Sequence, residues 1–590
     1  MSFIGSTPRL RRVVAAVAVA GALAGCGYGR TSVWESPPDD DRSSATDSPV
    51  SDSEDLSADR RPARATACRV DGGRSAGPAP ARLLTNYEYR YTVRDVLGYE
   101  GGAWKSLPAE NEVNGFENNT AAHAASRRRV REFMKVAEKV ARRTVDRRLD
   151  ALLPCDPSNG RKRACGVEFI DSFLTEAFRR PPTDAEKSDF VGLFERTLDE
   201  ADFETAVETV VAAALQSPQF LYRLEFVDGQ ASGAVERVDG WEMASRLSYF
   251  LWASAPDERL ARAARNGELK TEAQVEAQAR RMLDDPRAKR AVYQFHRQWM
   301  GLDELGSVVK DETRFPAFET SMTEDWRRSL KAYVTQQYQR DDADLESFLT
   351  SRRVYLTDRL KSLYDPSGPV RSDAGAGDGL TAYRFDGSER AGLLTQPALM
   401  ALLANANQSS PVRRGVWIRE QLLCQPLDPP PQDADTTPPD PDPNATTREK
   451  FRQHTADPQC AGCHRKIDPI GFGFTHYDAL GRWRQREEGR RLDDSGRLVA
   501  TRDPQLEGRF EGSVELAKRL EGSRQVSNCI ASKWFTYALG RQPNDRERCS
   551  LYHVQQAFRE SGGDFRELLV ALVTSDAFRY RRISSGGSSK

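Results

Sequence analysis

The feature that most constrains the fold is a helical pattern that occurs twice, far apart in the chain. Arg180 to Glu186 and Arg541 to Glu547 share, in order, an arginine, a proline, an aspartate and a glutamate. Further on, Ser217 to Arg223 and Ser575 to Arg581 share the pattern Ser-x-x-Phe-x-Tyr-Arg. Such self-similarity indicates a duplicated three-helix unit, here over residues ~165–223 and ~529–581. The alternative is coincidence between two generic helical hairpins.

Apolar residues recur at helical spacing through most of the chain from Leu83 onward. Between Trp483 and Gly512 the chain is instead punctuated by Gly and Asp-Gly, which favours short strands. We therefore predict a mainly α, multi-domain helical protein with a small β excursion. The predicted segments are a signal peptide (1–26), a disordered tether (27–80), an N-terminal helical domain (81–150), the first repeat (151–228), a central helical domain (235–365), a domain with a Cys-x-x-Cys-His motif and a Pro-rich strap (385–512), and the second repeat (513–582).

The N-terminus predicts export and lipid anchoring. Arg9, Arg11 and Arg12 precede a short apolar run. A run of about a dozen apolar residues is typical of a signal peptide, since a spanning helix needs about 20. The run ends in Leu-Ala-Gly-Cys26, which resembles a bacterial lipobox, and Gly27 after it favours outer-membrane sorting. We expect a lipoprotein attached through Cys26 to the outer membrane, on its periplasmic or cell-surface face; the alternative is an ordinary signal peptide with a chance cysteine.

The charge balance argues against a general nucleic-acid binder. The formal net charge is -1, whereas such a protein needs a basic stripe. The one basic run, Arg127 to Arg148, is interrupted by acidic residues and has apolar residues at helical spacing. It is therefore interpreted as the solvated face of an amphipathic helix.

The cysteines divide into three groups. Of the nine, Cys26 is assigned to lipid and two belong to the Cys-x-x-Cys-His motif, which leaves six. In an oxidising compartment an even remainder predicts up to three disulfides. The pairs considered are Cys155 with Cys165, which closes a short loop, Cys529 with Cys549, which joins neighbouring helices, and, by elimination, Cys68 with Cys424.

The motif itself spans Cys460, Cys463 and His464 and predicts covalent attachment of haem c. Two thiols at this spacing add to the two vinyl groups of haem, and the adjacent histidine becomes the proximal ligand of the iron. Pro469 lies where a proline-containing loop would place a carbonyl against the histidine Nδ1–H. Arg482 is a candidate contact for a haem propionate, and a surface Arg-Trp pair is the alternative.

The second axial ligand is less defined. No methionine follows Met400, which argues against a simple methionine-ligated cytochrome. His476 and His454 are the histidine candidates, His476 being the one we select, and a five-coordinate iron is the alternative. Rival explanations of the two motif cysteines are a disulfide, an inactive remnant, or a zinc site. Zinc needs four ligands, and no second Cys/His cluster accompanies the motif.

With these motifs in view, the chain resembles a family of exported proteins from planctomycetes and myxobacteria. Its members combine several domains of unknown function with a planctomycete-type cytochrome Cys-x-x-Cys-His element. The resemblance rests on Leu84 to Arg90, Leu247 to Trp252, Ser410 to Gly415, Cys460 to Gly471 and Tyr477 to Trp483. It extends over nearly everything from Leu83 to Arg581 and implies a haem site but no established substrate.

Two functional hypotheses follow. The first is an exported c-type haem lipoprotein that transfers electrons to a redox partner protein or performs a redox step on an unknown substrate. The second is a non-redox surface binding or scaffold lipoprotein, for example for polysaccharide, in which the motif is structural or vestigial. Sequence motifs do not decide whether the chain is an enzyme: it has no His-Glu-x-x-His, Walker loop or Gly-x-Ser-x-Gly elbow.

Overall fold

The computed structural model describes most of the chain after its N-terminal region. The described residues are 73–123, 126–225, 233–338, 340, 343–369, 377, 379–429, 437, 439–440, 442, 444–452 and 458–583. They form two compact units. Unit 1 contains residues 86–109 and 126–223, and unit 2 contains residues 73–85, 110–123 and 224–583.

Unit 1 is helical. Its longest helix, α3, buries Phe133, Val136 and Val140 at helical spacing, while its arginines are largely exposed, so the basic run is an amphipathic helix as predicted. α3 packs against α6. The elements are α2 (Asn86–Leu97), η1 (Ala103–Ser106), α3 (Arg127–Leu152), α4 (Lys162–Phe178), α5 (Asp184–Glu200), α6 (Phe203–Leu215), α7 (Pro218–Leu221) and β2 (Tyr222–Arg223).

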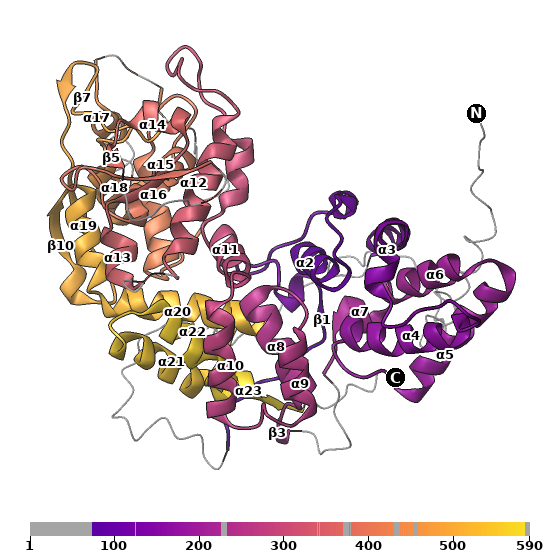
Figure 1. The fold of residues 1–590 in the computed structure, drawn as a ribbon. Helices are drawn as coiled ribbons and strands as arrows, with labels where there is room; N and C mark the ends of the chain where they lie inside the picture. Colours follow the sequence, from indigo (N-terminus) through magenta and orange to yellow (C-terminus); the bar gives the residue numbers. More distant parts are fainter. Residues whose placement is uncertain are drawn as a thin grey trace, which may run out of the picture. The chain divides into compact units, whose positions relative to one another are not determined.

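Unit 2 is larger and also mainly helical (Figure 1). Its helices are η2 (Thr120–Ala122), α8 (Gly240–Trp252), α9 (Glu258–Arg265), α10 (Glu272–Asp284), α11 (Ala288–Trp299), η3 (Leu302–Ser307), α12 (Met322–Gln336), α13 (Leu345–Thr350), α14 (Asp358–Tyr364), η4 (Leu393–Thr395), α15 (Pro397–Leu402), α16 (Pro411–Trp417), η5 (Ile418–Leu422), α17 (Thr447–Phe451), α18 (Pro458–Gly471), η7 (Phe472–Phe474), η8 (Pro504–Leu506), α19 (Gly512–Glu521), α20 (Arg524–Leu539), η9 (Asp545–Glu547), α21 (Arg548–Glu560), α22 (Phe565–Thr574) and α23 (Asp576–Arg579). The mainly α prediction is confirmed.

The strands of unit 2 are short. They are β1 (Arg82–Leu83), β3 (Val235–Arg237), β4 (Arg353–Leu356), β5 (Ser367–Pro369), β6 (Thr381–Arg384), β7 (Arg486–Glu487), β8 (Arg490–Arg491), β9 (Ser495–Leu498), β10 (Gly508–Glu511) and β11 (Tyr580–Arg582). β7–β8 and β9–β10 are antiparallel pairs and form the predicted β excursion. The sheet β4-β6-β5 was not predicted, because the polar, Gly-rich composition around β5 indicates a loop.

The two repeated segments adopt the same helical order within their respective units. α4, α5, α6 and α7 correspond to α20, α21, α22 and α23, and a short strand, β2 or β11, follows each copy. The first helix of each copy ends at a residue with left-handed backbone, Arg179 (φ 61°) or Gly540 (φ 61°). This arrangement supports the duplicated unit that the sequence predicts.

The arginine and the glutamate that both copies share form the same contacts in each copy. Arg180 pairs with Glu186 at 2.7 Å, and Arg541 pairs with Glu547 at 2.6 Å. Each glutamate also closes a capping box at the start of the following helix, which satisfies amide groups that a helix N-terminus leaves without partners. The hydrogen bond from Arg180 lowers the pKa of Glu186 to about 2.

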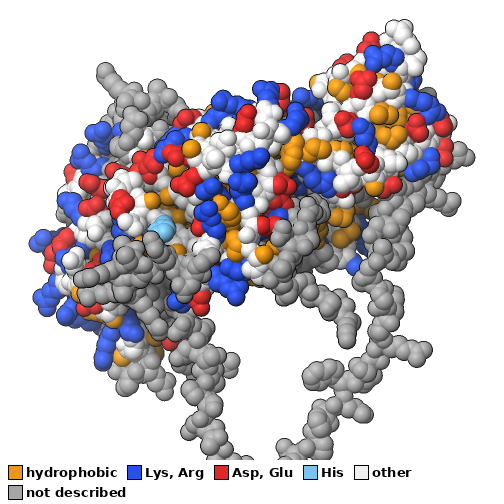
Figure 2. All heavy atoms as spheres, turned by 90° about the horizontal axis from the view of Figure 1, so that it is seen from below, with side chains coloured by type: hydrophobic (Ala, Val, Ile, Leu, Met, Phe, Trp, Pro, Cys, Tyr) orange, Lys and Arg blue, Asp and Glu red, His pale blue; other side chains and the backbone are white. Residues whose placement is uncertain are grey.

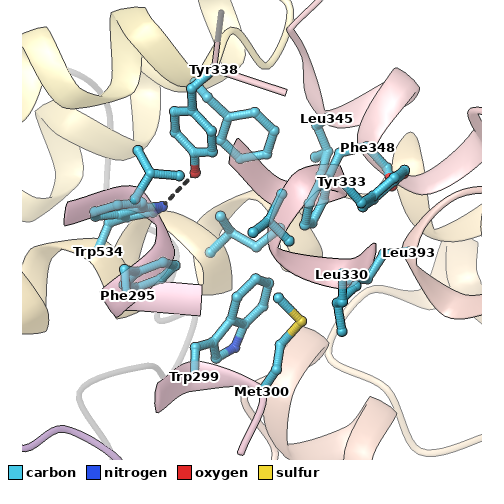
Figure 3. Packing of buried hydrophobic residues seen from close by; sticks show 14 of the residues in the cluster. Phe295, Trp299, Met300, Leu330, Tyr333, Tyr338, Leu345, Phe348, Leu393 and Trp534 are labelled. Carbon is cyan, nitrogen blue, oxygen red and sulfur yellow. Dashed lines mark hydrogen bonds between the residues drawn. The ribbon is translucent and has the colours of Figure 1, made fainter. Parts of the chain in front are cut away.

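The core of unit 2 is aromatic (Figure 3). Phe295 stacks on Trp534 with ring centroids 3.7 Å apart, and Trp534 Nε1 donates to Tyr338 Oη at 3.2 Å. These side chains come from α11, α20 and the turn that follows α12, so the core joins the central helices to the second repeat. Burying such rings dominates core energetics.

The predicted tether ends earlier than residue 80. Ser75 and Ala76 are buried in unit 2, and Ser75 accepts two hydrogen bonds from Ser550, at its carbonyl oxygen from Oγ (2.8 Å) and at its Oγ from the amide (3.0 Å). A polar composition does not reveal these long-range contacts. Residues 1–72, with the signal peptide and the lipobox, lie outside the described residues.

The described surface carries both signs of charge. Figure 2 shows Lys and Arg interspersed with Asp and Glu over one face, in keeping with the formal net charge of -1. None of the helices in the described residues is long and apolar enough to span a bilayer.

The buried His296 predicts a pH-dependent stability. Its Nδ1 donates to the Val292 carbonyl at 2.8 Å, and burial lowers the pKa of the imidazole to about 3. Between pH 3 and about 6.5 the unfolded chain binds a proton here that the folded chain excludes. The free energy of unfolding therefore falls as the pH is lowered from 6.5, by up to about 1.4 kcal/mol per pH unit. Urea denaturation across this range measures the slope.

The slope is assigned by comparing two variants. In His296→Leu the contribution of this group to the slope is lost, whereas the exposed His553→Leu keeps the wild-type slope. An unchanged slope in His296→Leu contradicts the prediction.

Candidate functional site

The Cys-x-x-Cys-His motif lies on helix α18, which begins at Pro458. Cys460, Cys463 and His464 are at positions i, i+3 and i+4 and therefore share one face of the helix. Cys463 is exposed, Cys460 is half-buried, and neither forms a disulfide within the described residues. Both thiols are thus available on the side of the helix that carries the histidine.

A buried carboxylate holds the motif histidine. Both carboxylate oxygens of Asp468, one helical turn after His464, lie 3.0 Å from His464 Nδ1. The Asp468 side chain is fully buried, whereas the His464 side chain is 20% exposed. The carboxylate favours the tautomer with its proton on Nδ1, in which Nε2 carries the lone pair that binds a metal.

This arrangement corrects the local structure predicted around Pro469. Pro469 lies inside α18 rather than in a loop beside the histidine, and the acceptor for Nδ1–H is the Asp468 carboxylate rather than a backbone carbonyl. A proline lacks the amide proton that a helix interior needs. α18 nevertheless continues past Pro469, and both α16 and β9 pack against it.

α18 is held by close backbone contact with α16. A Cβ on Gly415 would lie 2.2 Å from the Ile467 carbonyl oxygen, and one on Gly471 would lie 1.9 Å from the Pro411 oxygen. Only glycine allows this approach. Arg419, which is 1% exposed, also donates from Nε to the Lys466 carbonyl at 2.9 Å.

In the part of the chain that the structure describes, no group of three metal-ligating side chains includes the motif, and His454 lies outside that part. Among the described residues, the one acidic, cysteine or histidine group close enough to share an ion is Glu112, Glu117 and Asp303. Arg297 forms ion pairs with Glu117 and Asp303, so two of the group's three carboxylates already have a cationic partner. The motif side chains do fit a covalently bound haem, because two reduced thiols and an oriented imidazole share one face.

The two remaining predicted haem contacts lie outside α18. His476 donates from Nδ1 to the Arg484 carbonyl at 2.6 Å, has Nε2 3.5 Å from Asp494, and stacks on Trp483. It would have to leave these contacts to bind an iron. Arg482 pairs with Asp478 at 2.7 Å and lines a cavity that does not include the motif residues.

The disulfides agree only in part with the predicted pairs. Cys155 is bonded to Cys165 as predicted. Cys529 is bonded to Cys424, so the pairs Cys529 with Cys549 and Cys68 with Cys424 are wrong. Sequence separation favours a local partner for Cys529, but α20 packs against η5, which brings Cys424 to it. Cys26 and Cys68 lie outside the described residues.

Sequence reasoning missed a polar cavity of about 600 Å³ in unit 2. Its walls come from the loop before α12, the end of α14, the loop between α15 and α16, α17 and residues 478–488. No local motif marks it, because these segments are distant in the sequence. The nearest sequence signal is the cluster of charged residues from Arg482 to Glu488.

The α16–α18 contact predicts opposite effects for two glycine-to-alanine changes. Gly415→Ala forces the two helix backbones apart and should lower the free energy of unfolding by about 1–3 kcal/mol. Gly462→Ala, on the same helix pair, meets nothing within 4 Å and should raise it by about 0.5–1 kcal/mol. Urea denaturation measures both, and a Gly415→Ala protein as stable as wild type contradicts the packing.

Comparison with protein families gives matches along the described units. Five family models match, each described as a protein of unknown function: DUF1587 over residues 82–146, DUF1595 over 165–225, DUF1592 over 238–365, DUF1588 over 390–487 and DUF1585 over 508–578. The DUF1588 match includes Cys460, Cys463 and His464. Neither the curated proteins nor the solved structures give a match.

Proposed function

The chain belongs to a family of multi-domain proteins of the planctomycete cytochrome c type, and from this premise we propose that it carries one covalently bound haem at Cys460, Cys463 and His464. The observation that carries the proposal is the geometry of α18. Two reduced thiols share a helix face with a histidine that a buried carboxylate orients.

Each motif residue has a separate role in this proposal. The Cys460 and Cys463 thiols would add across the two vinyl groups, each forming a carbon–sulfur bond while its proton goes to the neighbouring vinyl carbon. His464 Nε2 would ligate the iron. The bound haem supplies one-electron redox chemistry. α16 and Arg419 hold α18 so that the three side chains keep their spacing.

Asp468 is a positioning residue in this site. Its carboxylate accepts the Nδ1 proton of His464, which makes the imidazole a stronger donor from Nε2. A more basic, partly anionic ligand favours the higher oxidation state of the iron. The site is thus suited to a low reduction potential among c-type centres.

The proposed cellular role is electron transfer outside the cytoplasm. A signal peptide and Cys26 in a lipobox would place the protein on the outer membrane, and haem attachment to Cys-x-x-Cys-His suits an exported protein. The exposed Cys463 puts the haem-carrying face of α18 at the protein surface, where a redox partner protein reaches it.

Covalent haem attachment is tested by co-expression with a cytochrome maturation system. The wild-type protein should show a Soret band and a haem-stained band that survives a denaturing gel, because the thioether bonds are covalent. Cys463→Ala and His464→Ala should reduce or abolish both signals. His553→Ala, which changes an exposed histidine elsewhere, should leave both signals unchanged.

A wild-type protein that matures without haem refutes this function. That result favours the alternative, a non-redox surface binding or scaffold lipoprotein in which the motif is structural.

Asp468→Asn should raise the reduction potential of the haem protein. The change replaces a charged acceptor by a neutral one and weakens ligand donation. If the loss of donation weakens the ferric state relative to the ferrous state by about 10–100-fold, the one-electron potential rises by about 60–120 mV. Spectroelectrochemical titration measures the shift, with Asp545→Asn, a change at an exposed carboxylate, as the control. An equal potential in wild type and Asp468→Asn contradicts the role.

A further inference from the structure

The polar cavity of unit 2 carries an inference that does not depend on haem. Its volume, about 600 Å³, is in the range of small-molecule sites, about 300–1,000 Å³. Most of its charged side chains are neutralised within the wall. Three ion pairs do this: Arg314 with Glu488 at 2.9 Å, Arg482 with Asp478 at 2.7 Å, and Arg484 with Glu487 at 2.9 Å.

Two cations of the wall have no ion pair among the described residues, Arg390 and Lys450, and Arg390 donates instead to the carbonyls of Thr395 and Gly481. Lys450 is only 7% exposed, yet within the described residues its ammonium has no hydrogen bond or ion pair. Burial lowers the pKa of Lys450, and the charges of Glu487 and Glu488 act against that effect without contacting it. Lys450 lines the cavity, so an anion bound there would supply the partner that the wall does not give its ammonium.

The nearest buried carboxylate is not available to Lys450. Glu487 Oε1 accepts from Thr447 Oγ1 at 2.7 Å and from Arg484, and Glu487 Oε2 accepts from the Thr447 amide at 2.6 Å. Arg484 lies in the same wall, and its positive charge contributes to the lowered pKa of Lys450, so the two cations lie close enough to interact. This corner of the cavity is therefore suited to the carboxylate of a ligand.

The rest of the wall suits hydroxyl groups and an apolar ring face. Glu389, Asp365 and Asn407 bring side-chain acceptors to the cavity, and burial is the main reason that the pKa of Glu389 is raised. A hydroxyl group both donates and accepts, so it satisfies such a mixed wall, whereas a simple anion would be repelled by the two carboxylates. Trp483 and Phe315 add aromatic surface.

We propose that this cavity binds a sugar acid, that is, a hydroxylated ring with one carboxylate, with the carboxylate on Lys450 and Arg484. Lys450 is the residue that distinguishes the acid from the neutral sugar. The hydroxyl groups face Glu389, Asp365 and Asn407.

Isothermal titration calorimetry of the purified protein tests the proposal. The probes are glucuronate and galacturonate, their neutral counterparts glucose and galactose, and the anions acetate and inorganic phosphate. At least one uronate should bind saturably, and at least about tenfold more tightly than its neutral counterpart, because a charge-assisted pair contributes about 1.5–3 kcal/mol. Equal binding of the neutral sugar, tighter binding of phosphate, or no binding of either uronate overturns the proposal.

Lys450→Met keeps the hydrocarbon chain and should abolish the preference for the uronate. Because the change removes a charge that has no ion pair from a mostly buried side chain, the variant should melt at or above the wild-type temperature. The control is Lys466→Met, which removes an exposed lysine outside the cavity wall. Retention of the preference in Lys450→Met overturns the proposal.

A further variant tests the charge of the wall. Asn407→Asp adds a negative charge to the wall at nearly constant shape and should weaken uronate binding more than neutral-sugar binding; equal weakening of both overturns the proposal.

A Cys460→Ala, Cys463→Ala double variant separates this proposal from haem attachment, and it should bind the uronate as wild type does. Failure of haem attachment thus leaves this result intact, and the two proposals are tested separately.

Discussion

Buried arginine side chains that donate to backbone carbonyls hold the motif region together. Arg414 is 1% exposed and donates from Nη1 to the carbonyls of Phe474 and Tyr477, at 2.8 and 3.2 Å. Its Nη2 lies 3.4 Å from the Met400 carbonyl and 3.3 Å from that of Asp478. Each carbonyl left without a donor in such a place costs about 1–3 kcal/mol. One guanidinium therefore joins α15 to the continuous stretch from η7 to Asp478.

Helix α16 supports both candidate sites. Arg414 on α16 holds the loop that continues into the cavity wall at Asp478, and Gly415 on the same helix contacts the motif helix α18. The short helix α16 thus makes two separate contacts: Gly415 packs against α18, and the Arg414 guanidinium binds backbone carbonyls. A change in α16 is expected to disturb haem attachment and ligand binding together, whereas changes at Lys450 or Cys463 separate them.

The duplicated helical unit has a structural rather than a catalytic explanation. In both copies an arginine and a glutamate form an ion pair, and the same glutamate caps the next helix. The pattern therefore reappears because it lies between two helices and caps the start of the second one. In the second copy, α20 also supplies Trp534 to the aromatic core and Cys529 to the disulfide with Cys424.

The sequence by itself determined the features that depend on neighbouring residues. Helical periodicity, the charge pattern of the repeats, the β excursion and the short Cys155–Cys165 loop are all local, so they could be predicted. Spacing also predicted that the motif side chains share a surface, although Pro469 suggested a loop where the chain is helical.

Only the tertiary structure decided the partners that are distant in the chain. It joined Cys529 to Cys424, buried Asp468 beneath His464, and assembled a cavity wall from segments between Arg314 and Glu488. Such contacts depend on how helices pack, and packing is governed by the shape and burial of surfaces that no short stretch of sequence contains. The contact between Asp468 and His464 and the position of Lys450 in the cavity wall could therefore be identified only from the tertiary structure.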